Sequence, residues 1–191
     1  SNENLCKKLL EQIDFNEKKN ILDIGCGYGT QDFYWTENYN CNITAIDISK
    51  IQIDSANKEK EEKSVENITF KIGDAEDLQY EDESFDNIVC LESAFHYKDR
   101  EKFFKEAYRV LKKGNSMIIG DINLKENTFG FINTIIFYFL IYICKIPQKN
   151  FINNNTYVKQ LKNAGFKVKK INITKQTFYP YFKYFIKNNK L

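Results

Sequence analysis

The residues between Asn20 and Thr30 have the types and spacing of a ligand-binding turn. A short apolar run, Ile21-Leu22-Asp23-Ile24, is typical of a buried strand, and three glycines follow it at alternate positions. A glycine-rich turn between a strand and a helix lets the backbone approach a ligand closely. It also presents the N–H groups of the helix N-terminus to that ligand. This stretch therefore raises the question of nucleotide binding.

The spacing of the glycines separates two kinds of nucleotide site. The dinucleotide fingerprint needs G-x-G-x-x-G. This chain instead has Gly25-x-Gly27-x-Gly29, with Asp23 two residues ahead of the first glycine. The pattern strand-D-x-G-x-G-x-G resembles that of the class I methyltransferases, which bind S-adenosylmethionine.

The resemblance continues along the chain, in the order and at the separations typical of that family. Its further landmarks are Asp47, which ends a second apolar run 18 residues after Gly29, Gly73-Asp74-Ala75, the strand-like segment Ser84–Leu91 and the helix end Ala107–Gly114. Several landmarks in the correct order are more specific than a single glycine loop. The resemblance covers about Leu5 to Thr174.

The resemblance implies S-adenosylmethionine as cofactor, S-adenosylhomocysteine as product and no metal. The Asp47 carboxylate would accept hydrogen bonds from both ribose hydroxyls, Ile48 would pack on the adenine, and Asp23 would orient the loop or reach the methionine amino group. Tyr28 would face the methyl group or cover the loop. The implied cofactor-binding residues are Asp23, Gly25, Cys26, Gly27, Tyr28, Asp47, Ile48, Asp74, Ala75 and Leu91. The alternative for Asp47 and Asp74 is the capping of turns at strand ends.

The candidate catalytic residue is His96, the only histidine of the chain. Methyl transfer needs mainly alignment of the acceptor, but an oxygen acceptor must also lose a proton, and histidine is the usual base near neutral pH. The segment Glu92–Val110 resembles natural-product and sugar O-methyltransferases. In that group a histidine at this position serves as base, with an aspartate at the end of strand five, here Asp121, as its partner. The alternatives are a structural histidine and an aspartate that caps a turn or binds substrate.

Strands that alternate with helices must position these residues. We expect strands at 21–24, 42–47, 67–72, 84–91 and 116–121, and helices at 31–39, 51–63 and 99–112. This alternation predicts an α/β fold, a Rossmann-like, doubly wound and mostly parallel sheet. The expected single domain, 1–191, comprises an N-terminal helix (1–19), a cofactor-binding core (20–121), an apolar insertion or lid (122–153) and a last helix, sixth strand and basic aromatic tail (154–191). The family's usual seventh strand has no evident counterpart.

The segment Phe129–Cys144 has sixteen residues and no charge. It is shorter than the about 20 residues that a membrane span needs, and a span there would separate the sixth strand from its sheet. We therefore expect no transmembrane span. Three interpretations stay open: a cover over the acceptor pocket, a helix buried by packing or by a second subunit of a homodimer, and a segment at a membrane surface.

Charge is distributed unevenly along the chain. The net charge is +2, yet residues 145–191 contain eleven lysines and no acidic residue. This asymmetry indicates either an anionic partner, such as a membrane surface, or a solvated lysine-rich face. Only two arginines occur and adenine-flipping motifs are missing, which argues against nucleic acid. The five cysteines are odd in number and lack metal-like spacing, so we expect a reducing, cytoplasmic location, with peripheral membrane contact as an alternative.

These observations predict a methyltransferase that uses S-adenosylmethionine and acts on a small molecule, at a hydroxyl, with His96 as general base and Asp121 assisting. One alternative is another acceptor: an amine, a carbon centre or a lipid-like molecule at a membrane surface. A second alternative is a protein of this fold that binds the cofactor without catalysis.

Overall fold

The computed structural model describes residues 19–121, 146–150 and 152–169. Five strands form one sheet in the order β3-β2-β1-β4-β5, and every neighbouring pair is parallel. The strands are β1 (Lys19–Ile24), β2 (Cys41–Asp47), β3 (Ile68–Ile72), β4 (Phe85–Leu91) and β5 (Leu111–Gly120). The order reverses between β1 and β4, which is where sheets of this kind bind ligands, beyond the carboxyl ends of the strands. The predicted α/β fold with a parallel sheet is confirmed.

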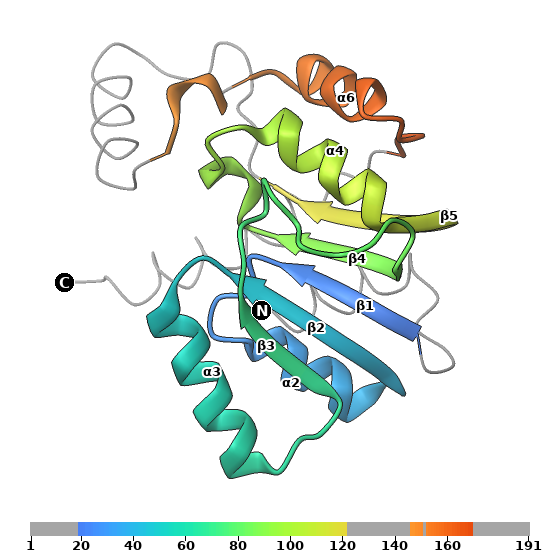
Figure 1. Ribbon diagram of the computed structural model, residues 1–191. Coiled ribbons are helices and arrows are strands. Elements are labelled where there is room, and N and C mark those ends of the chain that lie inside the picture. Colours follow the sequence, from blue (N-terminus) through green and yellow to red (C-terminus); the bar gives the residue numbers. More distant parts are fainter. Residues whose placement is uncertain (1–18, 122–145, 151, 170–191) are drawn as a thin grey trace, which may run out of the picture.

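Helices cover both faces of the sheet, with α2 (Thr30–Asn38) and α3 (Lys50–Lys63) on one face and α4 (Arg100–Val110) and α6 (Asn154–Asn163) on the other (Figure 1). Alternate residues of β1 explain this arrangement. Ile21 joins the core under α2 and α3, whereas Leu22 and Ile24 join the core under α4 and α6. Asp23 points to the same face as Ile21, so a carboxylate is buried beneath α2.

Two of the helices begin at residues whose side chains cap the first turn. The Asp99 carboxylate accepts a hydrogen bond from the Lys102 amide at 3.0 Å, and the Asn153 side chain accepts one from the Thr156 amide at 2.9 Å. Such caps satisfy N–H groups that the helix itself leaves without a partner. Ser49 occupies the same position before α3, but its side chain makes no capping bond. The Asp47 carboxylate instead accepts the Ser49 amide.

Helix α4 ends before the residue that the sequence predicts. The expected helix extended to Lys112, but Leu111 adopts an extended conformation and pairs with Phe85 of β4. The register then shifts within β5, so that Ser116 pairs with Asn87, and the irregular part of the strand includes Gly114 with a φ of 81°. Leu111 is buried, so the gain from burying its side chain favours the early end of the helix.

Some predicted elements lie wholly or partly outside the described residues. These are the N-terminal helix, the apolar segment 129–144, most of the insertion 122–153 and the aromatic tail. Lys19, the last residue of the expected N-terminal helix, is the first residue of β1. The predicted last helix is confirmed as α6, but the described part of the expected sixth strand, up to Lys169, contains no strand.

Candidate functional site

The glycine loop connects β1 to α2 at the point where the strand order reverses. Gly25, Gly27 and Gly29 have φ values of 80°, 59° and 74°, which non-glycine residues rarely adopt. The amides of Gly25 and Cys26 both donate to the Ile46 carbonyl, at 2.8 and 3.0 Å. The loop is therefore bound to the end of β2 and not only to its own strand.

Gly25 and Gly27 have different surroundings. A Cβ atom on Gly25 would lie 2.5 Å from the Cβ of Ser93 and 2.9 Å from the hydroxyl oxygen of Tyr97, too close for either contact. A Cβ atom on Gly27 would meet only the Gln52 side chain, at 3.6 Å. Gly25 is thus required by packing within the protein, whereas the space beside Gly27 is open to a ligand.

The Asp47 carboxylate links the glycine loop to the turn after β2. One of its oxygens accepts the Gly27 amide at 3.0 Å and the other accepts the Ser49 amide at 2.8 Å. Each carboxylate oxygen can accept more than one hydrogen bond, so the group can also bind ribose hydroxyls. The turn-capping alternative and the ligand-binding prediction are therefore compatible for Asp47.

Asp23 is completely buried. The Gln31 side chain donates to its Oδ2 at 2.6 Å, and the Asp32 carboxyl of α2, also completely buried, interacts with it. Desolvation by burial raises the pKa of both carboxyls, and the repulsion between them adds to this effect in Asp32. Two roles were predicted for Asp23: orienting the loop, or direct contact with the methionine amino group. Because its side chain is inaccessible, the geometry favours the first role.

Asp32 and Gln31 are site residues that the sequence analysis missed. Asp32 has no hydrogen-bond donor for either carboxylate oxygen from the described residues, and Asp23 has none for its Oδ1. A proton shared by the two carboxyls would supply a hydrogen bond between one oxygen of Asp32 and one of Asp23, as in other close carboxyl pairs. The only sequence signal is an acidic residue in the first turn of α2, a position that helix dipoles favour in any helix.

This pair predicts an unusual dependence of stability on pH. A carboxyl whose pKa is raised by folding stabilises the protein fully below the unfolded pKa and loses that contribution as pH rises through the folded pKa. Asp32→Asn keeps a neutral donor beside Asp23 at all pH values. The unsubstituted protein should therefore lose more stability than Asp32→Asn as pH rises. We expect the melting temperature of Asp32→Asn minus that of the unsubstituted protein to become more positive from about pH 5 to about pH 8.5. Thermal unfolding over this range measures it.

Asp32→Ala is the matched control, because it removes the charge without supplying a donor. It should be less stable than Asp32→Asn at every pH, since it leaves a cavity and an unpaired Asp23 oxygen. A difference between Asp32→Asn and the unsubstituted protein that stays constant with pH would contradict a shared proton.

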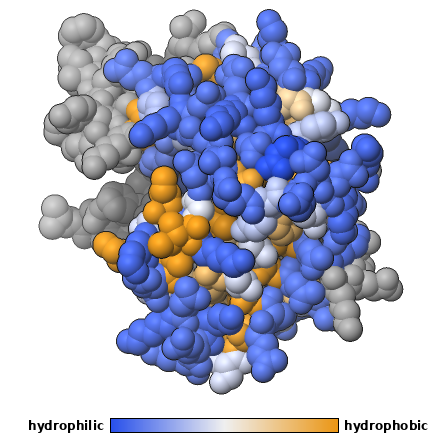
Figure 2. All heavy atoms as spheres, in the orientation of Figure 1, coloured by the Kyte–Doolittle hydropathy of each residue, from blue (hydrophilic) through white to orange (hydrophobic). Residues whose placement is uncertain are grey.

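The other predicted cofactor residues differ in exposure. Ile48 and Tyr28 are exposed, at 75% and 53%, and are accessible to a ligand. Ile51 and Ile72 are also exposed apolar residues near the carboxyl ends of β2 and β3, the side of the molecule where Figure 2 shows hydrophobic surface. An apolar surface beside a polar loop suits the adenine and ribose of one ligand.

Of the remaining residues predicted to bind the cofactor, three lie in the core and one, Asp74, is exposed. Cys26, Ala75 and Leu91 are buried, and burial raises the pKa of the Cys26 thiol, which makes it a small apolar side chain and not a nucleophile. The Asp74 carboxylate accepts the Glu76 amide at 2.8 Å. This hydrogen bond matches the turn-capping alternative for Asp74.

His96 lies in the connection between β4 and α4, in the short 3₁₀ helix η1 (Ala94–His96). It is exposed, with its ring 4.3 Å from that of Phe95 between centroids, and partial burial lowers its pKa below 6.5. The imidazole is therefore neutral near pH 7 and can accept a proton.

The connection that carries His96 is bonded to the glycine loop. The Ser93 hydroxyl donates to the Ile24 carbonyl at 3.1 Å, and the Tyr97 hydroxyl, which donates to Ser93 at 3.0 Å, lies 3.3 Å from the same carbonyl. Ile24 directly precedes Gly25. The candidate base and the candidate cofactor loop are therefore parts of one hydrogen-bonded unit.

Asp121 follows β5, and its side chain is only 3% exposed. Its carboxylate accepts a hydrogen bond from the Tyr157 hydroxyl at 2.8 Å and lies 3.8 Å from the Arg100 guanidinium, which is itself buried. Arg100 also lies over the Tyr157 ring, 4.5 Å from its centroid. Asp121 thus belongs to a buried charged group between α4 and α6, a partnership that its sequence position does not indicate.

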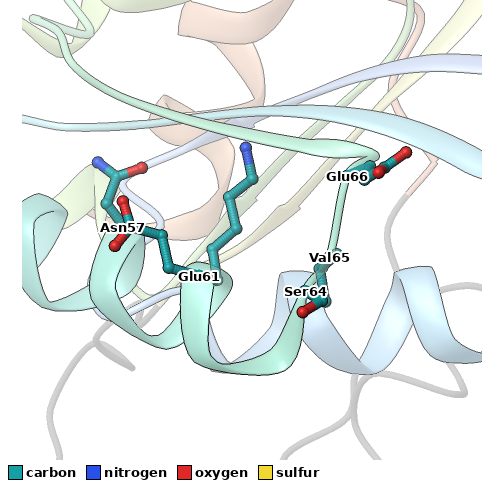
Figure 3. Close-up of a pocket in the computed structure, with 6 residues that line it drawn as sticks. Asn57, Glu61, Ser64, Val65 and Glu66 are labelled. Carbon is teal, nitrogen blue, oxygen red and sulfur yellow. The ribbon is translucent and has the colours of Figure 1, made fainter.

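A hollow of about 250 Å³ lies elsewhere, at the C-terminal end of α3 (Figure 3). It is lined by Asn57, Lys60, Glu61, Ser64, Val65 and Glu66. Helix α3 runs from the carboxyl end of β2 back to the start of β3. The hollow therefore lies near the amino-terminal ends of the strands, whereas the glycine loop lies at their carboxyl ends. It is not part of the candidate site.

Within 19–121, 146–150 and 152–169, no three His, Cys, Asp or Glu side chains are grouped as metal ligands would be. None of the helices in those ranges has the length and hydrophobicity that crossing a membrane requires.

Comparison with known proteins identifies the family. Residues 22–119, about half of the chain, match the methyltransferase domain family. The erythromycin 3''-O-methyltransferase of Saccharopolyspora erythraea is 34% identical over 182 residues, covering 87% of this chain and 56% of that protein. A phosphoethanolamine N-methyltransferase 1 of Triticum aestivum is 28% identical over 162 residues, covering 84% of this chain and 30% of that protein. The chain thus spans about half the length, or less, of these relatives.

A solved structure agrees with this assignment. The phosphoethanolamine N-methyltransferase 2 of Haemonchus contortus, in complex with S-adenosyl-L-methionine, superposes with a TM-score of 0.83 at 20% identity, covering 98% of this chain and 43% of that one. At this identity the likeness concerns the fold. Together with the family match and the glycine loop at the strand reversal, it shows that the chain belongs to the class I methyltransferases, whose cofactor is S-adenosylmethionine.

Proposed function

We propose that the protein transfers a methyl group from S-adenosylmethionine to a hydroxyl of a small molecule, with His96 as the general base. The observation that carries the proposal is the bonding of the His96 connection to the Ile24 carbonyl, through Ser93 and Tyr97. This contact ties the exposed imidazole to the loop that would bind the cofactor. It supports a role for His96 beside the reacting atoms.

The residues around the glycine loop fit the cofactor. Asp47 would hold the ribose, Ile48 would cover one face of the adenine, and the open side of Gly27 would admit the ligand close to the backbone. When bound, the cofactor supplies a methyl group on a sulfonium, which is a good leaving group. Asp23 and Gln31 would hold the loop from below.

His96 would accept the proton of the acceptor hydroxyl. Its lowered pKa keeps the imidazole neutral at physiological pH, which is the form that a base requires. Asp121 would assist indirectly, because its carboxylate neighbours Arg100, whose guanidinium also donates to the Asn150 carbonyl at 3.3 Å. We therefore assign Asp121 a positioning role.

Calorimetric titration with S-adenosylmethionine and S-adenosylhomocysteine tests the cofactor site. We expect saturable binding to the unsubstituted protein and binding at least about tenfold weaker to Asp47→Ala, a loss of about 1.4 kcal/mol or more. The substitution removes the acceptor for the Gly27 and Ser49 amides as well as the predicted ribose contact. Asp54→Ala, which removes an exposed carboxylate paired with Lys50 on α3, should bind normally.

Absence of binding by the unsubstituted protein would contradict the cofactor assignment for this chain. Equal binding by Asp47→Ala and Asp54→Ala would remove Asp47 from the site. Binding without turnover against every acceptor would favour the alternative of a cofactor-binding protein without catalysis.

A nitrogen acceptor is the second candidate, because relatives named phosphoethanolamine N-methyltransferases match most of this chain. Transfer of a labelled methyl group to a macrolide glycoside with a free sugar hydroxyl and to phosphoethanolamine compares the two acceptor classes. We expect methylation of the hydroxyl probe. Methylation of phosphoethanolamine alone would replace the oxygen proposal with the nitrogen one.

A further inference from the structure

The 3₁₀ helix that carries His96 is too short to fix an exposed side chain by itself. Within it, the His96 amide donates to the Ser93 carbonyl at 2.9 Å and the Tyr97 amide lies 3.4 Å from the Ala94 carbonyl. Short 3₁₀ turns have poorer hydrogen-bond geometry than α-helices. The orientation of the imidazole therefore depends on contacts from elsewhere in the fold.

Asn150 makes two such contacts, one on each side of His96. Its side-chain amide nitrogen donates to the Phe95 carbonyl at 2.9 Å and to the Tyr97 carbonyl at 2.7 Å. These are the carbonyls of the residues directly before and after the histidine. Because only an NH₂ group can donate twice, the two acceptors determine which way the amide is turned. Asn150 is 5% exposed, so water competes little for these bonds.

Asn150 is itself held in place from several directions. It ends the 3₁₀ helix η2 (Gln148–Asn150), where its amide donates to the Pro147 carbonyl at 2.9 Å. The Arg100 guanidinium donates to the Asn150 carbonyl and to the Gln160 side chain of α6, both at 3.3 Å. The same guanidinium lies 3.8 Å from Asp121. Asn150 is therefore connected to α4, to α6 and to the end of β5.

We propose that Asn150 is a positioning residue that fixes the backbone on both sides of His96. This inference rests on the base role proposed above for His96. A general base must lie within hydrogen-bond reach of its proton, and a misplacement of about 1 Å can lower a rate about 10²-fold. Asn150 lies 54 residues after His96, and no motif marks it in the sequence.

His96 is the only histidine, so its ring gives unique NMR signals that report on this arrangement. In the full chain, the Phe95 ring at 4.3 Å should displace the His96 ring-proton signals from the positions of a solvated histidine. Asn150→Ala removes both donors and should move these signals towards the solvated positions. Asn150→Asp, of nearly the same size, replaces the donors with oxygen that the two carbonyls repel, and should move them in the same direction.

Asn153→Ala is the matched control. It removes the side-chain oxygen that accepts the Thr156 amide in the first turn of α6, three residues after Asn150, and leaves both bonds to the His96 connection in place. We expect it to lower the melting temperature, because the first turn of α6 loses its cap, and to leave the His96 signals unchanged. Calorimetric titration with S-adenosylhomocysteine should give the same affinity for all three variants, because none alters the glycine loop.

The three outcomes that would contradict these proposals are distinguishable. If His96 signals are unchanged in folded Asn150→Ala and Asn150→Asp, Asn150 does not position the histidine, whatever His96 does. If the signals move but His96→Ala transfers methyl groups normally, Asn150 positions the histidine and the proposed base role is wrong. Equal displacement of the signals in Asn153→Ala would show that any damage to this segment moves His96, and would overturn the specific role.

Discussion

Replacing His96 with alanine is expected to lower methyl transfer to a hydroxyl acceptor by about 10²- to 10⁴-fold, the usual contribution of a general base. The affinity for S-adenosylhomocysteine should not change. The residues predicted to bind the cofactor lie around the glycine loop, whereas the His96 ring packs against the ring of Phe95. Radiolabelled methyl transfer and calorimetry measure the two quantities separately.

The dependence of the methyl-transfer rate on pH in the unsubstituted protein should also report on the His96 imidazole. A base works when it is unprotonated, so the rate should fall as pH decreases through the pKa of His96, which partial burial lowers from its usual value. In His96→Ala this limb should disappear from the residual activity. Lys98→Ala, two residues away and also exposed, should keep both rate and profile.

An amine acceptor would give a different result. If His96→Ala retained most of its activity on a hydroxyl probe, His96 would not be the base. If it retained activity on phosphoethanolamine but lost activity on hydroxyls, the protein would accept both and the base would matter only for oxygen.

The second large effect is expected at Gly25. In Gly25→Ala, the new Cβ would combine a left-handed φ of 80° with steric overlap against Ser93 and Tyr97. Backbone strain and overpacking each cost about 1–3 kcal/mol. Their sum is a large part of the about 5–15 kcal/mol that stabilises a typical domain. We expect a marked decrease in the melting temperature and loss of cofactor binding.

Gly27→Ala tests whether the cofactor occupies the space beside Gly27, because the new Cβ would disturb little of the protein's own packing. Its Cβ would lie in the same unfavourable φ region but would meet only Gln52, at 3.6 Å. We expect it to fold, with a smaller decrease in melting temperature than Gly25→Ala, and to bind S-adenosylhomocysteine at least about tenfold more weakly. Normal affinity in Gly27→Ala would show that the cofactor does not use the open side of this residue.

The sequence indicated the strands and the glycine loop around the candidate cofactor site because these elements are built from local patterns. The glycine spacing, the apolar runs and the acidic residue at the end of β2 each depend on a few neighbouring residues, and the parallel sheet follows from their alternation. The early end of α4 was not predictable in the same way. Leu111 leaves the helix to pair with Phe85, a residue 26 positions earlier in the chain.

The sequence by itself determined the fold class, the family and the place of the glycine loop. Only the tertiary structure decided which side chains are bonded to one another: Asp23 to Gln31 and Asp32 beneath the loop, Asp121 to Tyr157 and Arg100, and Asn150 to the backbone around His96. These partners come from different elements, and polar side chains of their types occur throughout the surface. Their roles arise from burial, which makes each hydrogen bond strong and each unpaired group costly. Burial is a property of the packed layers, so no local spacing could have revealed it.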